Sequence, residues 1–333
     1  MNNFLPLGKL NNKLLIKILN DIKNEGASPK IGEDSATINI RSDNNLLLSS
    51  DPITFDSEDI GEHILDICAN DIYAAGGEPK WFLITILIPP KTSYNKFKRV
   101  ISKVNSRAQS LKVDIIGGHT EVTESVNKIV LSGTIVGRIN KNFVPNQIVK
   151  GNQSIILGGQ AGIEGSKIIV ENTESNHKII SNLKKSIKNL TISVNNIAKI
   201  AISTGKIIKM HDPTEGGIST ALHELCEFSD IGCEIIENEI KFVDNFNEAC
   251  QILNLNPLGV ISSGCLLMIC KEKDSSEIIN KLRSSDIPAI KIGKTTNSKK
   301  RNIIKKDGKK ENLERFDQDE IIKIFRNVYR QSI

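Results

Sequence analysis

Apolar residues recur every three or four positions in several segments of the chain, which is the spacing of an amphipathic helix. In the first half this pattern covers residues 10–22, 59–75 and 92–111, so the sequence predicts three helices there. Between them, short apolar runs end at polar turn residues, as expected for β-strands. Strands are predicted over residues 36–40, 46–50, 81–88, 113–116 and 128–139.

A second set of the same kinds of element begins after the polar stretch 150–152. The two sets predict a mixed α/β and α+β protein of two domains, residues 1–150 and 151–333. The dipeptide Asp307-Gly308 is typical of a tight hairpin turn. In this second half, strands are predicted over residues 154–157 and 265–270, helices over 190–204, 218–228 and 318–330, and a turn over 211–217.

Composition and charge narrow the class of protein. The 333 residues are 39% hydrophobic and 25% charged, which is typical of a globular protein and argues against intrinsic disorder. The net charge of +5 reflects a general excess of lysine, and only 4% of the residues are aromatic. A nucleic-acid surface with base-stacking side chains is therefore not expected. The basic cluster at residues 299–301 is interpreted as a solvated strand edge.

Three further features bear on location. The longest apolar run, residues 81–88, is far shorter than the ~20 residues of a membrane helix. The N-terminal sequence MNNFLPLGKL lacks the basic and apolar regions of a secretory signal. No cysteine belongs to a C-x-x-C pair, so buried, reduced thiols in a cytoplasmic protein are predicted instead of a zinc or thioredoxin-type motif. The cysteines are Cys68, Cys226, Cys233, Cys250, Cys265 and Cys270.

Acidic residues beside glycine or at predicted strand ends are the main chemical signal. Carboxylates at strand ends can converge in space, and their hard oxygen atoms suit Mg²⁺ together with substrate phosphates. Neighbouring glycines allow backbone N–H groups to approach phosphate oxygens. Metal and phosphate binding are together most of what phosphoryl transfer requires of a protein. The residues concerned are Asp34, Asp51, Asp71, Glu121, Asp212 and Glu215.

Each of these signals also has a structural interpretation. An Asp before Pro, such as Asp51, is usually part of a turn or a helix cap, and Asp71 is compatible with a buried, hydrogen-bonded carboxylate. His119 and His211 are expected to be structural more often than catalytic. The chain contains neither the G-x-x-x-x-G-K-[ST] motif of a P-loop enzyme nor the G-x-S-x-G motif of a serine hydrolase.

Taken together, five motifs follow the order and approximate spacing of one superfamily: GEDSATI, SSDPIT, NDIYAAGGEP, GGHTEVT and HDPTEGG. The chain resembles the aminoimidazole ribonucleotide synthetase-like superfamily, which includes the purine-pathway synthetase, selenophosphate synthetase, thiamine monophosphate kinase and the hydrogenase maturation protein HypE. The similarity continues through GIEGSKII, SSGCLLM and ERFDQDEIIKIF, and so covers nearly the whole chain. SSDPIT and GGHTEVT are most similar to HypE and its relatives.

The resemblance implies an N-terminal α/β domain whose strands pair with a second subunit into a barrel, and a C-terminal α+β domain. It also implies a homodimer that binds ATP near the subunit interface, with Mg²⁺ held by acidic residues. The chemistry shared by the superfamily is ATP-driven phosphorylation of an oxygen, which then leaves as phosphate. By the same resemblance, Asp34, Asp51, Asp71 and Asp212 are the expected metal ligands, and Asn70, Gly117, Gly118, His119 and Glu121 are expected to line the nucleotide site.

The chain also departs from the relatives it resembles. HypE ends in a cysteine that receives a carbamoyl group, whereas residues 329–333 here read YRQSI. Selenophosphate synthetase has a reactive Cys or selenocysteine near its N-terminus, whereas the first cysteine here is Cys68. Neither thiol-based mechanism is therefore expected to transfer. Lys9 and Lys30 are early cations that could neutralise a phosphate, although a solvated surface lysine is the commoner role.

Three functions remain open on the sequence. The leading hypothesis is an ATP- and Mg²⁺-dependent enzyme that activates an amide or carbonyl oxygen of a small molecule or a protein group. The alternatives are a small-molecule kinase of the thiamine monophosphate kinase type, and a nucleotide-binding maturation partner without turnover. The expected partners are a second copy of the chain and either a small-molecule substrate or a maturation protein, and not a nucleic acid or a membrane.

Overall fold

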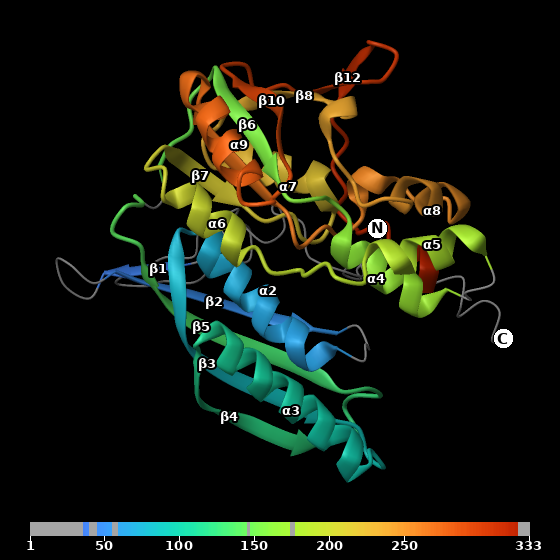
Figure 1. The fold of residues 1–333 in the computed structure, drawn as a ribbon. Helices are drawn as coiled ribbons and strands as arrows, with labels where there is room; N and C mark the ends of the chain where they lie inside the picture. Colours follow the sequence, from blue (N-terminus) through green and yellow to red (C-terminus); the bar gives the residue numbers. More distant parts are fainter. Residues whose placement is uncertain (1–35, 40–44, 55–58, 145–146, 174–176, 326–333) are drawn as a thin grey trace, which may run out of the picture. The chain divides into compact units, whose positions relative to one another are not determined.

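The computed structural model describes residues 36–39, 45–54, 59–144, 147–173 and 177–325. They form two compact units (Figure 1), the first made by the described residues up to 144 and the second by those from 147 onward. Each unit contains a β-sheet and helices of its own, which confirms the mixed α/β composition predicted from the sequence.

The first unit is built on a five-stranded sheet in the order β1-β2-β5-β3-β4. Strands β3 and β4 are parallel, and every other neighbouring pair is antiparallel. Two helices accompany the sheet, α2 (Ile60–Ala74) and α3 (Tyr94–Leu111). The strands are β1 (Ala36–Asn39), β2 (Asn45–Ile53), β3 (Gly77–Ile88), β4 (Asp114–Val122) and β5 (Val130–Ile139).

The two helices of the first unit pack on one face of its sheet (Figure 1). Along β3, Phe82, Ile84 and Ile86 are buried, whereas Leu83 and Thr85 between them are exposed. Successive side chains of a strand point to opposite faces, so the buried set marks the face under the helices. We call this the helix face, and the opposite one the open face.

Strand β4 lies at the edge of the first sheet and is exposed along its whole length. Its apolar side chains Ile116 and Val122 are 57% and 65% exposed. An edge strand presents unpaired backbone N–H and C=O groups, and large exposed apolar side chains are uncommon on such strands unless another chain covers them. This edge is therefore suited to pairing with another strand.

The second unit is built on a seven-stranded sheet in the order β12-β11-β8-β10-β6-β9-β7. No described helix combines the length and the apolar character needed to cross a membrane. The strands are β6 (Gln153–Gly158), β7 (Ile207–His211), β8 (Gly232–Ile236), β9 (Leu266–Lys271), β10 (Ala289–Thr296), β11 (Arg301–Ile304) and β12 (Lys310–Asn312); the helices are α4 (Ile163–Asn172), α5 (Lys178–Ser186), α6 (Asn195–Ile202), α7 (Gly217–Glu227), α8 (Phe246–Ile252) and α9 (Ser275–Arg283).

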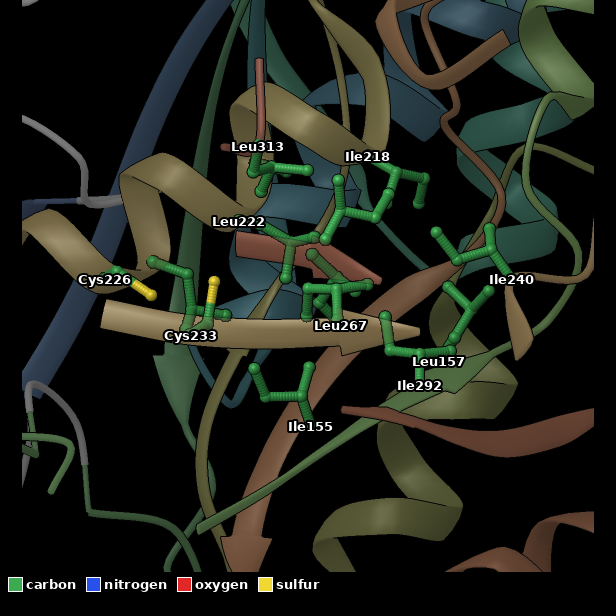
Figure 2. Close-up of a cluster of buried hydrophobic side chains, with 14 of the residues drawn as sticks. Ile155, Leu157, Ile218, Leu222, Cys226, Cys233, Ile240, Leu267, Ile292 and Leu313 are labelled. Carbon is green, nitrogen blue, oxygen red and sulfur yellow. The ribbon is translucent and has the colours of Figure 1, made fainter. Parts of the chain in front are cut away.

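The core of the second unit joins the central strands of its sheet to α7 (Figure 2). Ile155 and Leu157 of β6 and Leu267 of β9 are fully buried and cluster with Ile218 and Leu222 of α7. Burying a large aliphatic side chain contributes about 1.5–3 kcal/mol, so this cluster anchors α7 firmly. The helix begins at the last glycine of the HDPTEGG motif, and the core therefore fixes where that motif ends.

Most of the predicted elements are confirmed within the described residues, with several corrections. In the described part of the chain, the helix predicted over residues 318–330 begins only at residue 322, and residues 318–321 are not helical. The helix predicted over residues 190–204 spans only Asn195–Ile202. The strand predicted to end at residue 116 continues to Val122, so Gly117 and Gly118 lie within β4 and do not form a turn. Cys265 precedes β9 and is not its first residue. The hairpin predicted at Asp307-Gly308 is confirmed, because that turn joins the antiparallel strands β11 and β12. The helix predicted over residues 10–22 lies outside the described residues.

Candidate functional site

Two of the predicted metal ligands, Asp51 on β2 and Asp71 on α2, converge on the side chain of Ser49. The Ser49 Oγ lies 3.1 Å from the Asp51 Oδ2, and it also donates to the Asp71 Oδ2. A hydroxyl carries one proton, so it cannot make a full hydrogen bond to both carboxylates at once. The two carboxyl groups therefore share a single donor on one face of the first sheet.

The local sequence explains this convergence. Ser49 and Asp51 are two residues apart on β2, so their side chains point to the same face of the sheet. Both pair with inward-facing positions of β5, since Asp51 is opposite Gly133 and Ser49 is opposite Ile135. They therefore lie on the helix face, where α2 brings Asp71 to the same serine.

Cys68 lies in the interior beside this carboxylate pair. Burial raises the pKa of the Cys68 thiol well above its usual value, and the negative charges of Asp51 and Asp71 raise it further. On a helix, Cys68 and Asp71 are i and i+3 neighbours on one face. A Cβ added at Gly133 would lie 2.8 Å from the Cys68 Sγ, so this thiol fills the space left by a glycine. Cys68 is thus a protonated packing residue and not a nucleophile.

The GGHTEVT segment on β4 is separated from the carboxylate pair within the first unit. One row of paired residues crosses the sheet from Asp51 through Gly133 and Ile84 to Gly118. Three interstrand spacings of ~4.8 Å put the two ends of this row on the order of 14 Å apart. Gly118 has a φ of 153°, and a Cβ there would lie 1.9 Å from the Ile84 carbonyl oxygen.

His119 and Glu121 lie on the open face, opposite to the carboxylate pair. They are paired with Thr85 and Leu87, which alternate with the buried residues of β3. The His119 Nε2 and the Glu121 Oε2 are 3.6 Å apart, and both side chains are more than half exposed. The structure therefore does not bring these two side chains to Asp51 within one copy of the chain.

Of the remaining residues predicted in the first half, the structure places Asn70 only. Asn70 precedes Asp71 on α2 and is fully buried. Asp34, Lys9 and Lys30 lie outside the described residues. Sequence reasoning missed Ser49 as the residue that joins the two carboxylates. The period-two pattern of β2 could have identified it, because Ser49 interrupts the apolar face that Leu47 and Ile53 form.

In the second unit, the HDPTEGG motif links β7 to α7 and is largely buried. His211 ends β7, and its Nε2 lies 3.2 Å from the Glu224 Oε2 of α7. Asp212 is 2% exposed. Gly216 and Gly217 have φ values of 78° and 63°, a region that favours glycine, and α7 starts there. The motif therefore forms a compact, buried turn whose backbone conformation requires its two glycines.

Two buried carboxyl groups near this motif were not singled out from the sequence. The pKa of Glu164, in the first turn of α4, is raised to about 7, mainly by burial and also by the nearby Glu215, although Ser263 opposes the shift. Burial likewise raises the pKa of Asp319 to about 7, although backbone N–H groups of Ile321 and Gly216 oppose the shift. Glu164 stands in the apolar segment GIEGSKII, whereas Asp319 lies among polar residues in FDQDE, and neither context indicates the partner of the carboxyl group.

The oxygen donors of the first unit fit a magnesium ion that is shared with phosphates. Mg²⁺ is usually held by one or two carboxylates and completes its octahedral shell with water and phosphate oxygens. Asp51, Asp71 and Ser49 offer two carboxylates and a hydroxyl. Across the described part of the chain, no cluster of three or more His, Cys, Asp or Glu side chains has the geometry of a complete cation site. The donors therefore suit a metal–nucleotide complex better than a bare ion.

Several proteins are similar to this chain in sequence. A Methanocaldococcus jannaschii protein named for hydrogenase expression and formation is 28% identical over 257 residues, which are 75% of each chain. The carbamoyl dehydratase HypE of Cupriavidus necator is 24% identical, covering 76% of this chain and 73% of that protein. Thiamine-monophosphate kinase of Bacillus subtilis is 26% identical over 54% of this chain and 56% of its own.

Solved structures share the fold. HypE in its complex with HypF has a TM-score of 0.79 at 20% sequence identity, covering 92% of this chain and 100% of that one. HypE in complex with ATP has a TM-score of 0.72 at 21% identity, covering 87% of this chain and 90% of that one. At these identities the likeness concerns the fold alone, and it supports the two-domain arrangement of mixed α/β type.

Family models account for most of the sequence. The model of the N-terminal domain of AIR synthase related proteins matches residues 32–139, which include the Asp51–Asp71 pair and β4. The model of the C-terminal domain matches residues 150–306, which include the HDPTEGG motif. Both domains are thus present in their usual order, and this chain belongs to the family of AIR synthase related proteins.

Proposed function

We propose that this chain is an ATP- and Mg²⁺-dependent enzyme that phosphorylates an amide or carbonyl oxygen, so that the oxygen leaves as phosphate. The observation that carries the proposal is the convergence of Asp51 and Asp71 on Ser49. Two carboxylates with one shared donor form a site for a cation, and Mg²⁺ with nucleotide phosphates is the cation complex that such oxygen donors suit. A HypE structure in complex with ATP has the same fold.

We assign the metal–phosphate contacts to residues of both halves of the chain. Bound Mg²⁺ would neutralise the charge that develops on the phosphates during transfer. Gly117 and Gly118 are consecutive residues of an edge strand, so the backbone N–H of one of them points away from β3 and is suited to approach a phosphate oxygen. The proposed metal ligands are Asp34, Asp51, Asp71 and Asp212, and the proposed nucleotide-binding residues add Asn70, Gly117, Gly118, His119 and Glu121.

We further propose a twofold-symmetric homodimer in which β4 and the open face meet a second copy. The exposed side chains of Ile116 and Val122 support pairing of the β4 edge with the second copy, because covering an apolar edge strand removes it from water. Val122 is paired with Ile88 and belongs to the helix face, so its support concerns the β4 edge. The separation of His119 and Glu121 from Asp51 within one copy supports it as well. In a dimer with a closed barrel, the second copy would supply the segment that completes each nucleotide site.

We propose that the phosphorylated oxygen belongs to a separate substrate and that none of the six cysteines carries a carbamoyl group. All six are buried and none forms a disulfide. A thiolate that receives a carbamoyl group must be mobile and accessible. Burial raises the pKa of Cys250 and Cys270 to about 12. The pKa of Cys226 is instead lowered, chiefly by its hydrogen bond with Cys233, but this thiol is fully buried in the core of the second unit. Reduced, buried thiols also support a cytoplasmic location.

Two other functions have specific support. Similarity to thiamine-monophosphate kinase favours a kinase that leaves its phosphate on a small molecule. The fold shared with HypE in its complex with HypF favours a nucleotide-binding maturation partner. Incubation with Mg-ATP and candidate amides, followed by mass spectrometry, separates the three. Loss of water from the acceptor with release of ADP and phosphate supports the proposed enzyme, a phosphorylated product supports the kinase, and no ATP turnover supports the partner.

A further inference from the structure

The segment 313–320, which we call the strap, runs along α7 and bonds to it repeatedly. The Leu313 carbonyl lies 3.0 Å from the His223 Nε2, and the Ser219 hydroxyl donates to the Glu314 carbonyl. Thr220 makes two contacts with Phe316: its hydroxyl lies 3.1 Å from the Phe316 carbonyl and accepts from the Phe316 N–H at 3.1 Å. The strap therefore follows α7 from its last turns back toward its beginning.

The strap ends at Asp319, whose carboxylate takes the place of a missing helix cap. Gly216 is the N-cap residue of α7 and has no side chain with which to cap it. Its backbone N–H donates to the Asp319 Oδ2 at 2.7 Å, and the Ile321 N–H donates to the Oδ1 at 2.8 Å. The first N–H groups of a helix lack partners within it, and a carboxylate is among the best acceptors for them.

The conformation of Gly216 depends on the strap in a second way. A Cβ at Gly216 would lie 2.7 Å from the Phe316 carbonyl oxygen and 2.4 Å from the Thr220 Oγ1. The strap backbone therefore packs directly against the glycine, and only a residue without a side chain fits between them. The strap therefore packs against the last residues of the turn that contains Asp212.

A second anchor fixes the strap itself. The Glu320 N–H donates to the Gly259 carbonyl at 3.1 Å, and the Glu320 Oε2 accepts from the Asn256 N–H at 2.8 Å. The same 256–260 loop packs against Gly217, where a Cβ would lie 2.5 Å from the Val260 carbonyl oxygen. The loop and the strap together enclose the two glycines of HDPTEGG from separate sides.

From these contacts we infer that Asp319 is a positioning residue, which holds the HDPTEGG turn so that Asp212 is presented in one orientation. The inference rests on the proposed function in one respect, the assignment of Asp212 as a ligand of the metal–nucleotide complex. Asp319 acts through the backbone of Gly216 and makes no contact with substrate in this account. Asp212 is buried and belongs to the turn that Asp319 closes, so loss of the cap is expected to disorder its orientation.

The first test measures the turn directly, independently of nucleotide. Asp319→Ala removes both acceptors, Asp319→Asn keeps one carbonyl oxygen, and Asp317→Ala is the control, because Asp317 is 63% exposed on the same strap. Hydrogen exchange is measured on peptides that cover residues 211–220. We expect exchange about tenfold faster in Asp319→Ala, an intermediate rate in Asp319→Asn, and wild-type rates in the control and in the β9 peptide 266–271. Wild-type exchange in Asp319→Ala would overturn the inference.

The second test measures Mg-ATP affinity by calorimetry for the same variants, with Asp51→Asn alongside. We expect a loss of about fivefold or more in Asp319→Ala, partial recovery in Asp319→Asn, and no change in Asp317→Ala. If Asp51→Asn loses affinity but Asp319→Ala does not, the positioning role is wrong and the proposed function stands. If the wild-type protein itself does not bind Mg-ATP, the proposed function fails, and the link from Asp319 to Asp212 fails with it.

Discussion

Asp51 on β2 and Asp71 on α2 meet at a single hydroxyl, that of Ser49. Two carboxyl groups that contact the same hydroxyl lie close enough for one cation to be attracted to both of them. This relationship connects the fold of the first unit to the proposed binding of a metal–nucleotide complex.

Substitution by alanine is expected to lower the free energy of unfolding at only one of the two adjacent glycines of β4. Gly118→Ala would place a Cβ 1.9 Å from the Ile84 carbonyl oxygen, whereas the nearest atom to a Cβ at Gly117 is 3.8 Å away. We expect urea denaturation to show a loss of more than ~2 kcal/mol for Gly118→Ala and a change within ~0.5 kcal/mol for Gly117→Ala. Equal losses for the two variants would mean that the path of β4 is different from the one described.

The course of β4 illustrates what the sequence could and could not predict. The mostly apolar run over residues 113–116 located its start, but the adjacent Gly117-Gly118 indicated that the strand ends there, because glycine pairs usually mark a turn. Pairing with the buried strand β3 overrides that local preference and continues the strand. The motifs could suggest the proposed metal ligands of the first unit, and the period-two pattern of β2 could suggest Ser49. The meeting of the two carboxyl groups at Ser49 depends on how β2 and α2 face each other, which no local pattern gives.

The bond between Asp319 and the start of α7 was even harder to predict from the sequence. Asp319 bonds to Gly216, which is 103 residues away in the sequence, and the pattern around it indicates only an amphipathic helix. A capping carboxylate close to its helix in sequence follows a known spacing, whereas one supplied by a distant strap follows none. Interactions of this kind depend on the tertiary fold, which neither periodicity nor composition specifies.

The buried carboxyl of Glu164 is expected to make stability depend on pH. Burial raises its pKa to about 7 in the folded chain, whereas an unfolded Glu titrates near ~4.3. The folded state therefore binds the proton more tightly, so its contribution to stability is complete below about pH 4 and is lost as the pH rises through 7. Relative to wild type, Glu164→Gln should gain on the order of 2 kcal/mol between pH 5 and pH 8.

Urea denaturation at the two pH values checks this expectation. Glu248 is a suitable control, because it also occupies the first turn of a helix, α8, but is exposed. We expect Glu248→Gln to track the wild type at both pH values. A constant difference between Glu164→Gln and wild type across this range would show that Glu164 does not titrate there.

The proposed dimer makes a prediction about the β4 edge. Replacing Ile116 and Val122 together by Asp places charges on an edge that another copy is proposed to cover, so we expect the double variant to be monomeric. Tyr94→Asp is the control, because Tyr94 is 73% exposed on α3 and belongs to no proposed interface. Light scattering at micromolar concentration measures the mass. A wild-type protein that is already monomeric under these conditions would exclude the dimer.

The most direct test of the account is Mg-ATP binding by isothermal titration calorimetry in the wild type, Asp51→Asn and Asp71→Asn, with the exposed Asp244→Asn as control. Thermal denaturation without nucleotide shows whether each variant is folded. We predict that both site variants bind Mg-ATP at least tenfold more weakly, a loss of about 1.4 kcal/mol or more, and that Asp244→Asn binds like the wild type. Wild-type affinity in folded Asp51→Asn and Asp71→Asn proteins would contradict the account, because the carboxylate pair would then not hold the metal–nucleotide complex.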